Sequence, residues 1–390
     1  MKKRIPLFLL LNLLWGVSTN GNAENSAYVS KVFDFVPAPG QFINQLPAHE
    51  TNDDSAAIIK KVENYIVGGQ NGLVSLGSYG GYVVVGFDHT IVNVSGEYDF
   101  KVYGNAFYSS NTATKVGGNS EPGIVMVSYD SNKNNLPDDE WYELAGSEYT
   151  KKTTIKNYEI TYYKPSTETE SQTGALADYI YWKDNMGSDG YVSKNAFHQQ
   201  SYYPQWIKSD SLVFKGILLP DNGVNESSTG NSYFLYAYDW GYADNHPNTS
   251  DLSNFKIEWA VDKDGNSVSL PGIDFIKIYT GVLQNDGWLG ECSTEVGTVM
   301  DLHPNATFSG IESTQINGLY IQNPFQETLS ISTPENIEIT FYNLSGKQIK
   351  TVQIATGNTL LPLNDLLKGI YIAKISSKTD VSVQKIIKTY

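Results

Sequence analysis

The sequence contains a single cysteine, Cys292, in 390 residues. A chain with one thiol has no internal disulfide, so its stability must come from a packed core or from bound metal. The segment "GWLGECST" surrounds the cysteine with no basic residue that would lower its pKa. We therefore expect Cys292 to be a buried, unreactive side chain.

Basic residues are also scarce. The chain has 27 Lys and Arg against 42 Asp and Glu, which gives a net charge of −15. Nucleic acids and anionic membrane surfaces attract basic proteins, so neither is an expected partner. The same balance is compatible with cation binding.

Long apolar runs are absent after the first residues. No later stretch approaches the roughly 18 apolar residues that a membrane-spanning helix needs. At the start, basic residues 2–4 precede an apolar run at 5–15, and small residues follow at 21–23. This pattern predicts a secretory signal peptide over residues 1–23 and a mature protein without a transmembrane segment.

Familiar catalytic motifs are missing as well. The sequence has no HExxH, no G-x-S-x-G, no phosphate-binding loop and no CxxC, and its five histidines are scattered. A glycoside hydrolase needs only two suitably placed carboxyl groups, and 42 acidic residues make such pairs unavoidable. A secreted hydrolase with a carboxylate pair in aromatic loops therefore stays open, although the sequence cannot nominate the pair.

Aromatic and β-branched runs separated by Gly, Asn and Asp dominate the remainder, with 27 Tyr and 34 Gly. They predict an all-β protein, a jelly-roll-like β-sandwich with long loops over residues 24–305. One short helix is expected in "NDDSAAIIKKVENYIVGG", where Asp53 or Asp54 can cap the start and two glycines end it. A linker at 306–318 and a small Ig-like β-sandwich at 319–390 complete the predicted domains.

The C-terminal segment carries four ordered motifs. They are "NPF" from Asn323, "FYNLSGKQI" from Phe341, "LKGIYIAKI" from Leu367 and "QKIIK" ending at Lys388. Residues 319–390 resemble the C-terminal sorting domain of the type IX secretion system of Bacteroidetes. The resemblance implies recognition by the type IX machinery and a location that is secreted or on the exterior of the outer membrane.

The main region resembles bacterial secreted β-sandwich proteins of a jelly-roll kind that bind carbohydrates or other ligands. The resemblance rests on segments in a matching order, among them "GGYVVVGFDHTIVN", "YDFKVYGNAF", "EPGIVMVSYDSN", "WAVDKDGNSVSLPGIDFIKIYTGV" and "GECSTEV". It implies a surface protein, and relatives accompany outer-membrane uptake systems, including those for corrinoids.

Two acidic loops are candidates for calcium, which takes oxygen ligands. In "YDSNKNNLPDDEW", Asp130, Asn132 and Asn134 alternate and Asp138 follows, but the Gly and Glu of an EF-hand are absent. In "VDKDGN", alternating oxygen ligands surround a glycine. Its ligand candidates are Asp262, Asp264 and Asn266. Each loop can also be an ordinary polar hairpin whose side chains cap their own backbone.

Two aromatic segments, at 179–206 and 236–248, are candidates for ligand binding, since rings stack on sugars and acids accept hydroxyl protons. The candidate residues are Trp182, Tyr203, Trp206, Asp239, Trp240, Tyr242, Asp244 and His246. Tyrosine is equally a good strand residue, so these rings can instead belong to the core. "GWLGECST" further places Trp288 near Glu291.

Together these features predict a calcium-stabilised binding protein, displayed on the cell surface, that holds a glycan or another nutrient. The alternatives are the hydrolase described above and a non-catalytic adhesion or structural protein, including an accessory of an uptake system.

Overall fold

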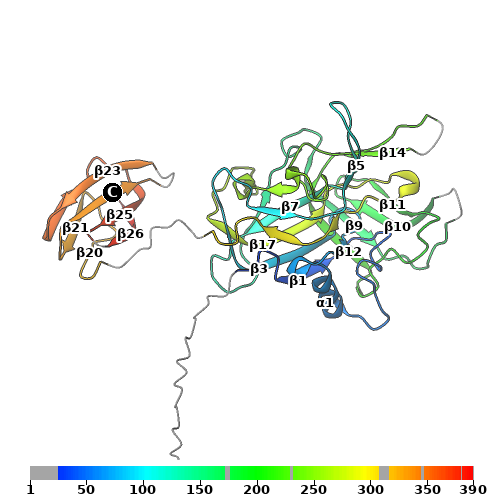
Figure 1. Ribbon diagram of the computed structural model, residues 1–390, viewed down its shortest axis with the longest axis horizontal. Coiled ribbons are helices and arrows are strands. Elements are labelled where there is room, and N and C mark those ends of the chain that lie inside the picture. Colours follow the sequence, from blue (N-terminus) through cyan, green and yellow to red (C-terminus); the bar gives the residue numbers. More distant parts are fainter. Residues whose placement is uncertain are drawn as a thin grey trace, which may run out of the picture. The chain divides into compact units, whose positions relative to one another are not determined.

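The computed structural model describes residues 25–171, 176–228, 232–306, 316–343, 347–378 and 380–389 (Figure 1). The predicted signal peptide and most of the predicted linker lie outside these ranges. The chain divides into two compact units, one up to residue 306 and one from residue 307. Within the described ranges, no helix is long and apolar enough to cross a membrane.

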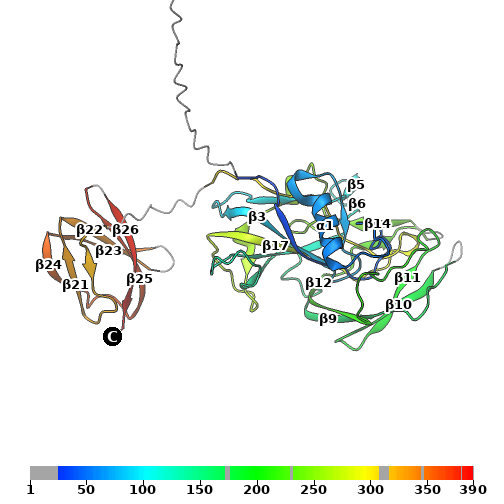
Figure 2. The ribbon, with the colours of Figure 1, turned by 90° about the horizontal axis from the view of Figure 1, so that it is seen from below.

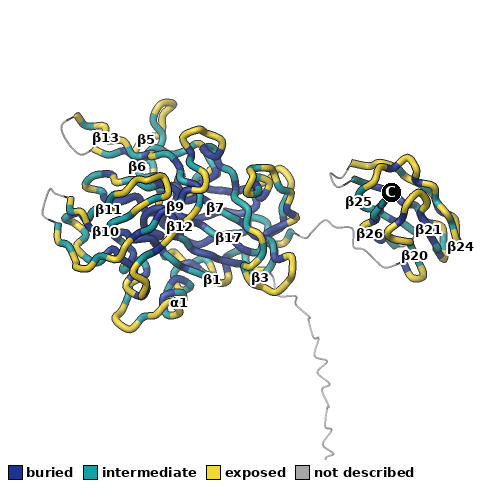
Figure 3. Tube along the Cα trace, turned by 180° about the vertical axis from the view of Figure 1, so that it is seen from behind, coloured by how far each residue is buried: buried dark blue, intermediate teal, exposed yellow. Residues whose placement is uncertain are grey.

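The larger unit is built on a six-stranded antiparallel sheet with the order β1-β3-β17-β7-β8-β16. The strands are β1 (Lys31–Val36), β3 (Tyr82–Val92), β17 (Gly272–Thr280), β7 (Gly123–Ser128), β8 (Trp141–Leu144) and β16 (Ala260–Val261). The central strands β3, β17 and β7 are rich in Val and Ile, which fit a pleated, buried surface. Figure 3 shows buried positions along β17 and β7.

The helix α1 (Ser55–Ile66) lies against β1 (Figure 2). Asp54 is its N-cap and accepts the Ala57 N–H at 2.9 Å, while Ile58 and Val62 are buried at helical spacing. This confirms the single predicted helix. It continues into the short 3-10 turn η1 (Val67–Gly69), where Gly68 adopts a φ of 69°.

A second sheet has the order β11-β10-β9-β12. Its strands are β9 (Ile155–Tyr163), β10 (Ala177–Asp184), β11 (Asp189–Lys194) and β12 (Ser211–Leu218). It encloses a tyrosine-rich core that includes Tyr79, Tyr158, Tyr162 and Tyr202. Much of the aromatic segment that the sequence suggested as a long loop is therefore the β10–β11 hairpin.

Three smaller sheets complete the unit, with the orders β13-β14-β6-β5, β15-β4-β19 and β18-β2. Their strands are β2 (Val74–Ser75), β4 (Phe100–Val102), β5 (Phe107–Asn111), β6 (Val116–Asn119), β13 (Gly223–Asn225), β14 (Tyr233–Tyr236), β15 (Asn254–Phe255), β18 (Glu295–Val296) and β19 (Val299–Asp301). Short 3-10 turns occur at η2 (Asp251–Ser253), η3 (Ile257–Trp259) and η4 (Gly287–Leu289).

The smaller unit consists of two antiparallel sheets, β20-β21-β24 and β23-β22-β25-β26, around an apolar core. Its strands are β20 (Tyr320–Ile321), β21 (Thr328–Thr333), β22 (Ile337–Tyr342), β23 (Gln348–Ile354), β24 (Gly357–Pro362), β25 (Gly369–Ser376) and β26 (Val381–Lys388). Across the described residues the architecture is antiparallel β with one α-helix, so the predicted all-β class is confirmed.

Two of the C-terminal motifs meet in this smaller unit. Asn323 Nδ2 donates to Lys385 O at 2.6 Å, and its Oδ1 accepts the Ile387 N–H at 2.9 Å. The Phe325 N–H donates to Ile387 O at 3.0 Å. The "NPF" segment is thus fastened to β26, the strand that carries "QKIIK".

Candidate functional site

The acidic loop between β7 and β8 holds its side chains in local hydrogen bonds. The two carboxylate oxygens of Asp130 accept the N–H groups of Asn134 at 3.1 Å and Asn135 at 2.8 Å. Asn132 Oδ1 also accepts the Asn134 N–H, and Asn134 Nδ2 donates to Asp138 at 3.0 Å. The four suggested ligands are neighbours, but Asp130 already caps the turn. Calcium binding here stays a prediction.

The second acidic loop is a tight hairpin turn. Asp262 Oδ1 accepts the N–H groups of Asp264 at 2.9 Å and Asn266 at 2.8 Å, and Gly265 has a φ of 83°. The hydrogen bond from Asn266 lowers the pKa of Asp262. The side chains therefore stabilise the turn itself, and calcium binding at this loop also stays a prediction.

The predicted aromatic ligand-binding residues do not form one groove. The rings of Tyr203, Trp206 and Tyr242 are only 2%, 6% and 1% exposed. Trp206 stacks on Phe35 with ring centroids 6.2 Å apart, and the Tyr242 hydroxyl accepts the Glu148 N–H at 3.0 Å. Trp206 and Tyr242 are packed in the core, whereas Tyr203 is buried but lines a pocket of about 600 Å³. The predicted roles of the three rings in ligand binding stay predictions.

The other predicted residues are dispersed. Trp182 lies half-buried in β10, Trp240 is half-buried against Trp259, and Asp239 is exposed. His246 is buried, and its Nδ1 lies 2.6 Å from the Tyr108 hydroxyl oxygen. Asp244 alone of the predicted set reaches the cluster of acids described next.

An acid-lined pocket of about 310 Å³ lies elsewhere on the larger unit. Its walls come from the loop after β1, the ends of β4 and β6, the turn after β11 and the segment 286–295. The lining residues are Gln41, Phe42, Leu46, Asn105, Asn119, Glu121, Phe197, His198, Leu235, Asp286, Trp288, Leu289, Glu291, Ser293 and Glu295. None of these residues is Lys or Arg.

Two lining acids at the floor of this pocket, Glu121 and Glu295, meet a third carboxyl group, that of the buried Asp244 behind the lining. One oxygen from each of Glu121, Asp244 and Glu295 lies within 4.8 Å of the others. Asn119 Nδ2 donates to Glu121 at 2.9 Å, and Asn105 Nδ2 donates to Glu295 at 3.4 Å. We call these three carboxyl groups the floor cluster. Burial, reinforced by their mutual repulsion, raises the pKa of Glu121 and Asp244.

The backbone fixes Asp244 in the floor cluster. Its Oδ1 accepts the N–H groups of Asn105 at 2.7 Å and Ala106 at 2.8 Å, and its Oδ2 accepts the Glu295 N–H at 2.9 Å. A Cβ at Gly104 would lie 2.3 Å from Asp244 Oδ1, so only glycine permits this close approach. One side chain thus ties together three segments that are distant in the sequence.

Glu291 forms part of the wall. Its Oε1 accepts the Gln41 N–H at 2.6 Å, while its Oε2 is buried without a hydrogen-bond partner among the described residues. Burial raises the pKa of Glu291 to about 8 and that of Asp286 to about 6. Near neutral pH, the carboxyl group of Glu291 in the pocket wall can therefore be protonated.

Aromatic rings surround the mouth of the pocket. Phe197 and Trp288 are 69% and 47% exposed, and their rings meet edge to face at 6.1 Å. Phe42 and His198 form a second edge-to-face pair at 4.7 Å. Burial lowers the pKa of His198, which is therefore neutral at neutral pH. The pocket thus has an acidic floor and an exposed aromatic mouth.

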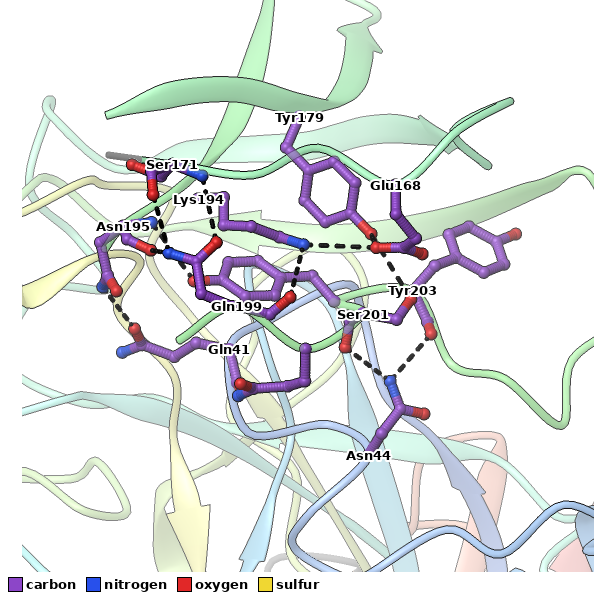
Figure 4. Close-up of polar contacts among 12 residues, drawn as sticks. Gln41, Asn44, Glu168, Ser171, Tyr179, Lys194, Asn195, Gln199, Ser201 and Tyr203 are labelled. Carbon is purple, nitrogen blue, oxygen red and sulfur yellow. Dashed lines mark hydrogen bonds and ion pairs between the residues drawn. The ribbon is translucent and has the colours of Figure 1, made fainter. Parts of the chain in front are cut away.

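A buried polar network holds the mouth in place (Figure 4). Asn195 Oδ1 accepts the N–H groups of Phe197 and His198, both at 3.0 Å, and its Nδ2 donates to Gln41 Oε1 at 2.9 Å. Next to it, the buried Lys194 ammonium donates to Gln199 O at 3.1 Å. The exposed rings are thereby anchored to the same Gln41 whose backbone contacts Glu291.

Only part of this site is predictable from the sequence. The proximity of Trp288 and Glu291 was visible in "GWLGECST", and Asp244 was a candidate, but Glu121 and Glu295 were not. The only indication of Glu121 and Glu295 in the sequence is that each is a single acid next to apolar residues, in "EPGIVMV" and "STEVG". That pattern identifies buried carboxyl groups without showing that they meet.

Residues 323–389 match the family described as the secretion system C-terminal sorting domain. The protein is therefore secreted, attached to the cell surface and handled by the type IX machinery. No curated protein matches the chain. One solved structure, the Faecalibacterium prausnitzii β-glucuronidase, is similar to this chain at 9% sequence identity and a TM-score of 0.15. The match covers 72% of this chain and 47% of the β-glucuronidase chain. The chain thus spans under half of that enzyme, and so low a score supports no conclusion.

Proposed function

We propose that this secreted, cell-surface protein binds a neutral glycan in the acid-lined pocket. The observation that carries the proposal is the exposed pair of rings, Phe197 and Trp288, at the mouth of a pocket with carboxyl walls. Large exposed rings stack on the apolar faces of sugars, and buried polar groups pair with the hydroxyls.

The size of the pocket limits what can enter. At about 310 Å³ it lies at the lower end of the roughly 300–1,000 Å³ that ligand pockets span. It therefore suits one end of a sugar chain better than a long internal segment.

The charge of the pocket favours an uncharged ligand. The lining residues include four acids and no Lys or Arg, so no basic side chain in the pocket would pair with a uronate or a sulfated sugar. Glu291, with its pKa raised to about 8, can both donate a hydrogen bond to a hydroxyl and accept one. This pairing suits polyols, whose hydroxyls do both.

Hydrolysis is the second candidate, because a protonated carboxyl group near other carboxylates is also the state of a general acid. Glu291 Oε2 is buried, unpartnered and on the pocket wall, as such an acid would be. A hydrolase of this kind would cleave the bound glycan, whereas a binding protein would release it unchanged.

The test is a binding screen of the exported protein against neutral and acidic glycans, repeated with calcium and with chelator. A corrinoid is included because the resemblance of the main region implies it. We expect binding to neutral glycans, no cleavage products on chromatography, and affinity lowered roughly tenfold or more by Trp288→Ala, since stacking is worth about 1–3 kcal/mol.

Tyr191→Ala is the matched control, because Tyr191 is 45% exposed but does not line the pocket. Its affinity should equal that of the unmodified protein. Equal losses in Tyr191→Ala and Trp288→Ala, or binding to acidic glycans alone, would contradict the proposal. Cleavage products that disappear in Glu291→Gln would establish the hydrolase instead.

A further inference from the structure

The floor cluster brings three acidic side chains together, and no basic side chain among the lining residues of the pocket pairs with them. Glu121, Asp244 and Glu295 place an oxygen each within 4.8 Å of the others, and Asp244 and Glu295 are 3% and 4% exposed. The lining residues of the pocket include no Lys or Arg to offset them. Buried carboxylates persist when they are protonated, paired or bound to metal.

An independent observation points to a ligand at this place. Glu295 Oε1 is buried with no hydrogen-bond partner among the described residues, and so is Oε2 of Glu291 in the adjacent wall. Both residues line the pocket. Native structures leave few buried polar atoms unpaired, so two in one pocket call for an explanation such as an ion.

The dimensions and chemistry fit one class of ion. Two oxygens bound to the same calcium at 2.3–2.6 Å are at most about 5 Å apart, which matches the spread of the floor cluster. All three groups are carboxylates, with no imidazole or thiol, so the set favours a hard cation over zinc or copper. The amide N–H groups of Asn105 and Asn119 donate to Glu295 and Glu121 and help to hold these carboxylates in place.

We propose that Glu121, Asp244 and Glu295 hold a calcium ion at the floor of the pocket. Asp244 is held in place because three backbone N–H groups donate to its carboxylate oxygens. Glu295, in β18, and Glu121, in the segment before β7, would supply the other two carboxylate ligands. The site does not depend on which molecule the pocket binds.

The test is calorimetric titration of the metal-free exported protein with calcium chloride, together with thermal unfolding in calcium and in chelator. We expect one calcium per chain and a Tm that rises with calcium, because an ion bound only to the folded state stabilises it. In Glu121→Gln and Glu295→Gln, calcium affinity should fall roughly tenfold or more, since affinity follows ligand charge.

The same two variants separate a metal site from a merely structural role. In chelator, their Tm should equal or exceed that of the unmodified protein, because one of three crowded carboxyl groups is neutralised. A structural carboxylate would instead lower the Tm equally in both buffers. Asp138→Asn and Asp262→Asn are the controls in the exposed loops, and they should bind calcium normally.

Terbium luminescence locates the site without changing a ligand. Terbium replaces calcium and emits when a nearby tryptophan is excited, so Trp288→Phe should weaken the emission and Trp141→Phe should not. Trp288 lines the pocket, whereas Trp141 directly follows the acidic loop.

Three results would overturn the proposal. The first is no calcium binding up to about 1 mM, the upper range for extracellular sites. The second is a calcium affinity that is unchanged in both Glu121→Gln and Glu295→Gln, and the third is terbium emission that depends on Trp141 alone. Calcium binding with a failed glycan screen would refute the proposed function and leave this site standing.

Discussion

The acidic loop at 130–139 and the floor cluster use the same side-chain chemistry in opposite ways. In the loop, Asp130 accepts two backbone N–H groups, and Asn134 donates to Asp138, so the polar groups satisfy one another. In the floor cluster, the carboxyl group of Glu295 is buried with an unpartnered oxygen.

This comparison shows that a ligand-like spacing of Asp and Asn in a sequence is weak evidence of a metal site. Residues close in sequence have neighbouring N–H groups to bind, and Asp and Asn use them to form turns. Carboxyl groups from distant segments meet inside the protein, where only each other, amides or a ligand can compensate them. A buried carboxylate oxygen without a hydrogen-bond partner is therefore a stronger indication of a ligand site than the spacing of acids in the sequence.

The largest expected effect comes from disturbing the floor cluster through its backbone. Gly104→Ala would place a Cβ 2.3 Å from Asp244 Oδ1. We expect the free energy of unfolding to fall by about 3 kcal/mol, within the range for overpacking a core. Gly265→Ala in the second acidic loop should cost only about 1 kcal/mol of φ strain. Equal costs in urea unfolding would break the contrast.

A pH titration of stability sharpens the contrast between buried and exposed acids. Glu143 is half-buried in β8, and partial burial raises its pKa to about 8, so between its unfolded pKa and 8 the folded state binds up to one more proton than the unfolded state. The free energy of unfolding should therefore fall as pH rises, by up to about 1.4 kcal/mol per pH unit from this group.

Glu143→Gln should remove that part of the slope. Asp262→Asn is the matched variant, because the pKa of Asp262 is lowered and its contribution is already complete above the unfolded pKa. Between pH 5 and 8 its slope should equal that of the unmodified protein. A slope unchanged in Glu143→Gln would contradict the raised pKa of Glu143.

The predictable parts of this protein are local. Helix α1 follows from its cap and apolar spacing, and the smaller unit follows from regular strands and motifs such as "NPF". The pocket and the floor cluster are not local, because Gln41, Glu121, Asp244 and Glu295 come from four distant segments. The sequence also does not show whether a tyrosine is exposed or buried, as Tyr203 and Tyr242 are, since tyrosine packs cores as readily as it binds sugars.

A smaller effect is expected from the acidic loop itself. Asp130→Asn keeps the shape of the side chain but loses the charge that accepts two N–H groups. The free energy of unfolding should fall by about 1 kcal/mol, as for the loss of a capping interaction. The calcium affinity measured by titration should not change. A large loss of calcium affinity would show that the ion binds in the acidic loop and not at the floor cluster.

The smallest effect is expected at the second turn. Asp262→Asn retains an oxygen that can accept the N–H groups of Asp264 and Asn266. We expect no measurable change in the free energy of unfolding, as is usual for surface substitutions. A measurable change that disappears in chelator would show that this turn binds metal.

The most direct measurement is an anomalous diffraction map from a crystal of the exported protein soaked in terbium. We predict an anomalous peak bounded by the carboxylates of Glu121, Asp244 and Glu295, at the floor of the pocket beneath Trp288. A peak between Asp130 and Asp138 with none at the floor would contradict the account.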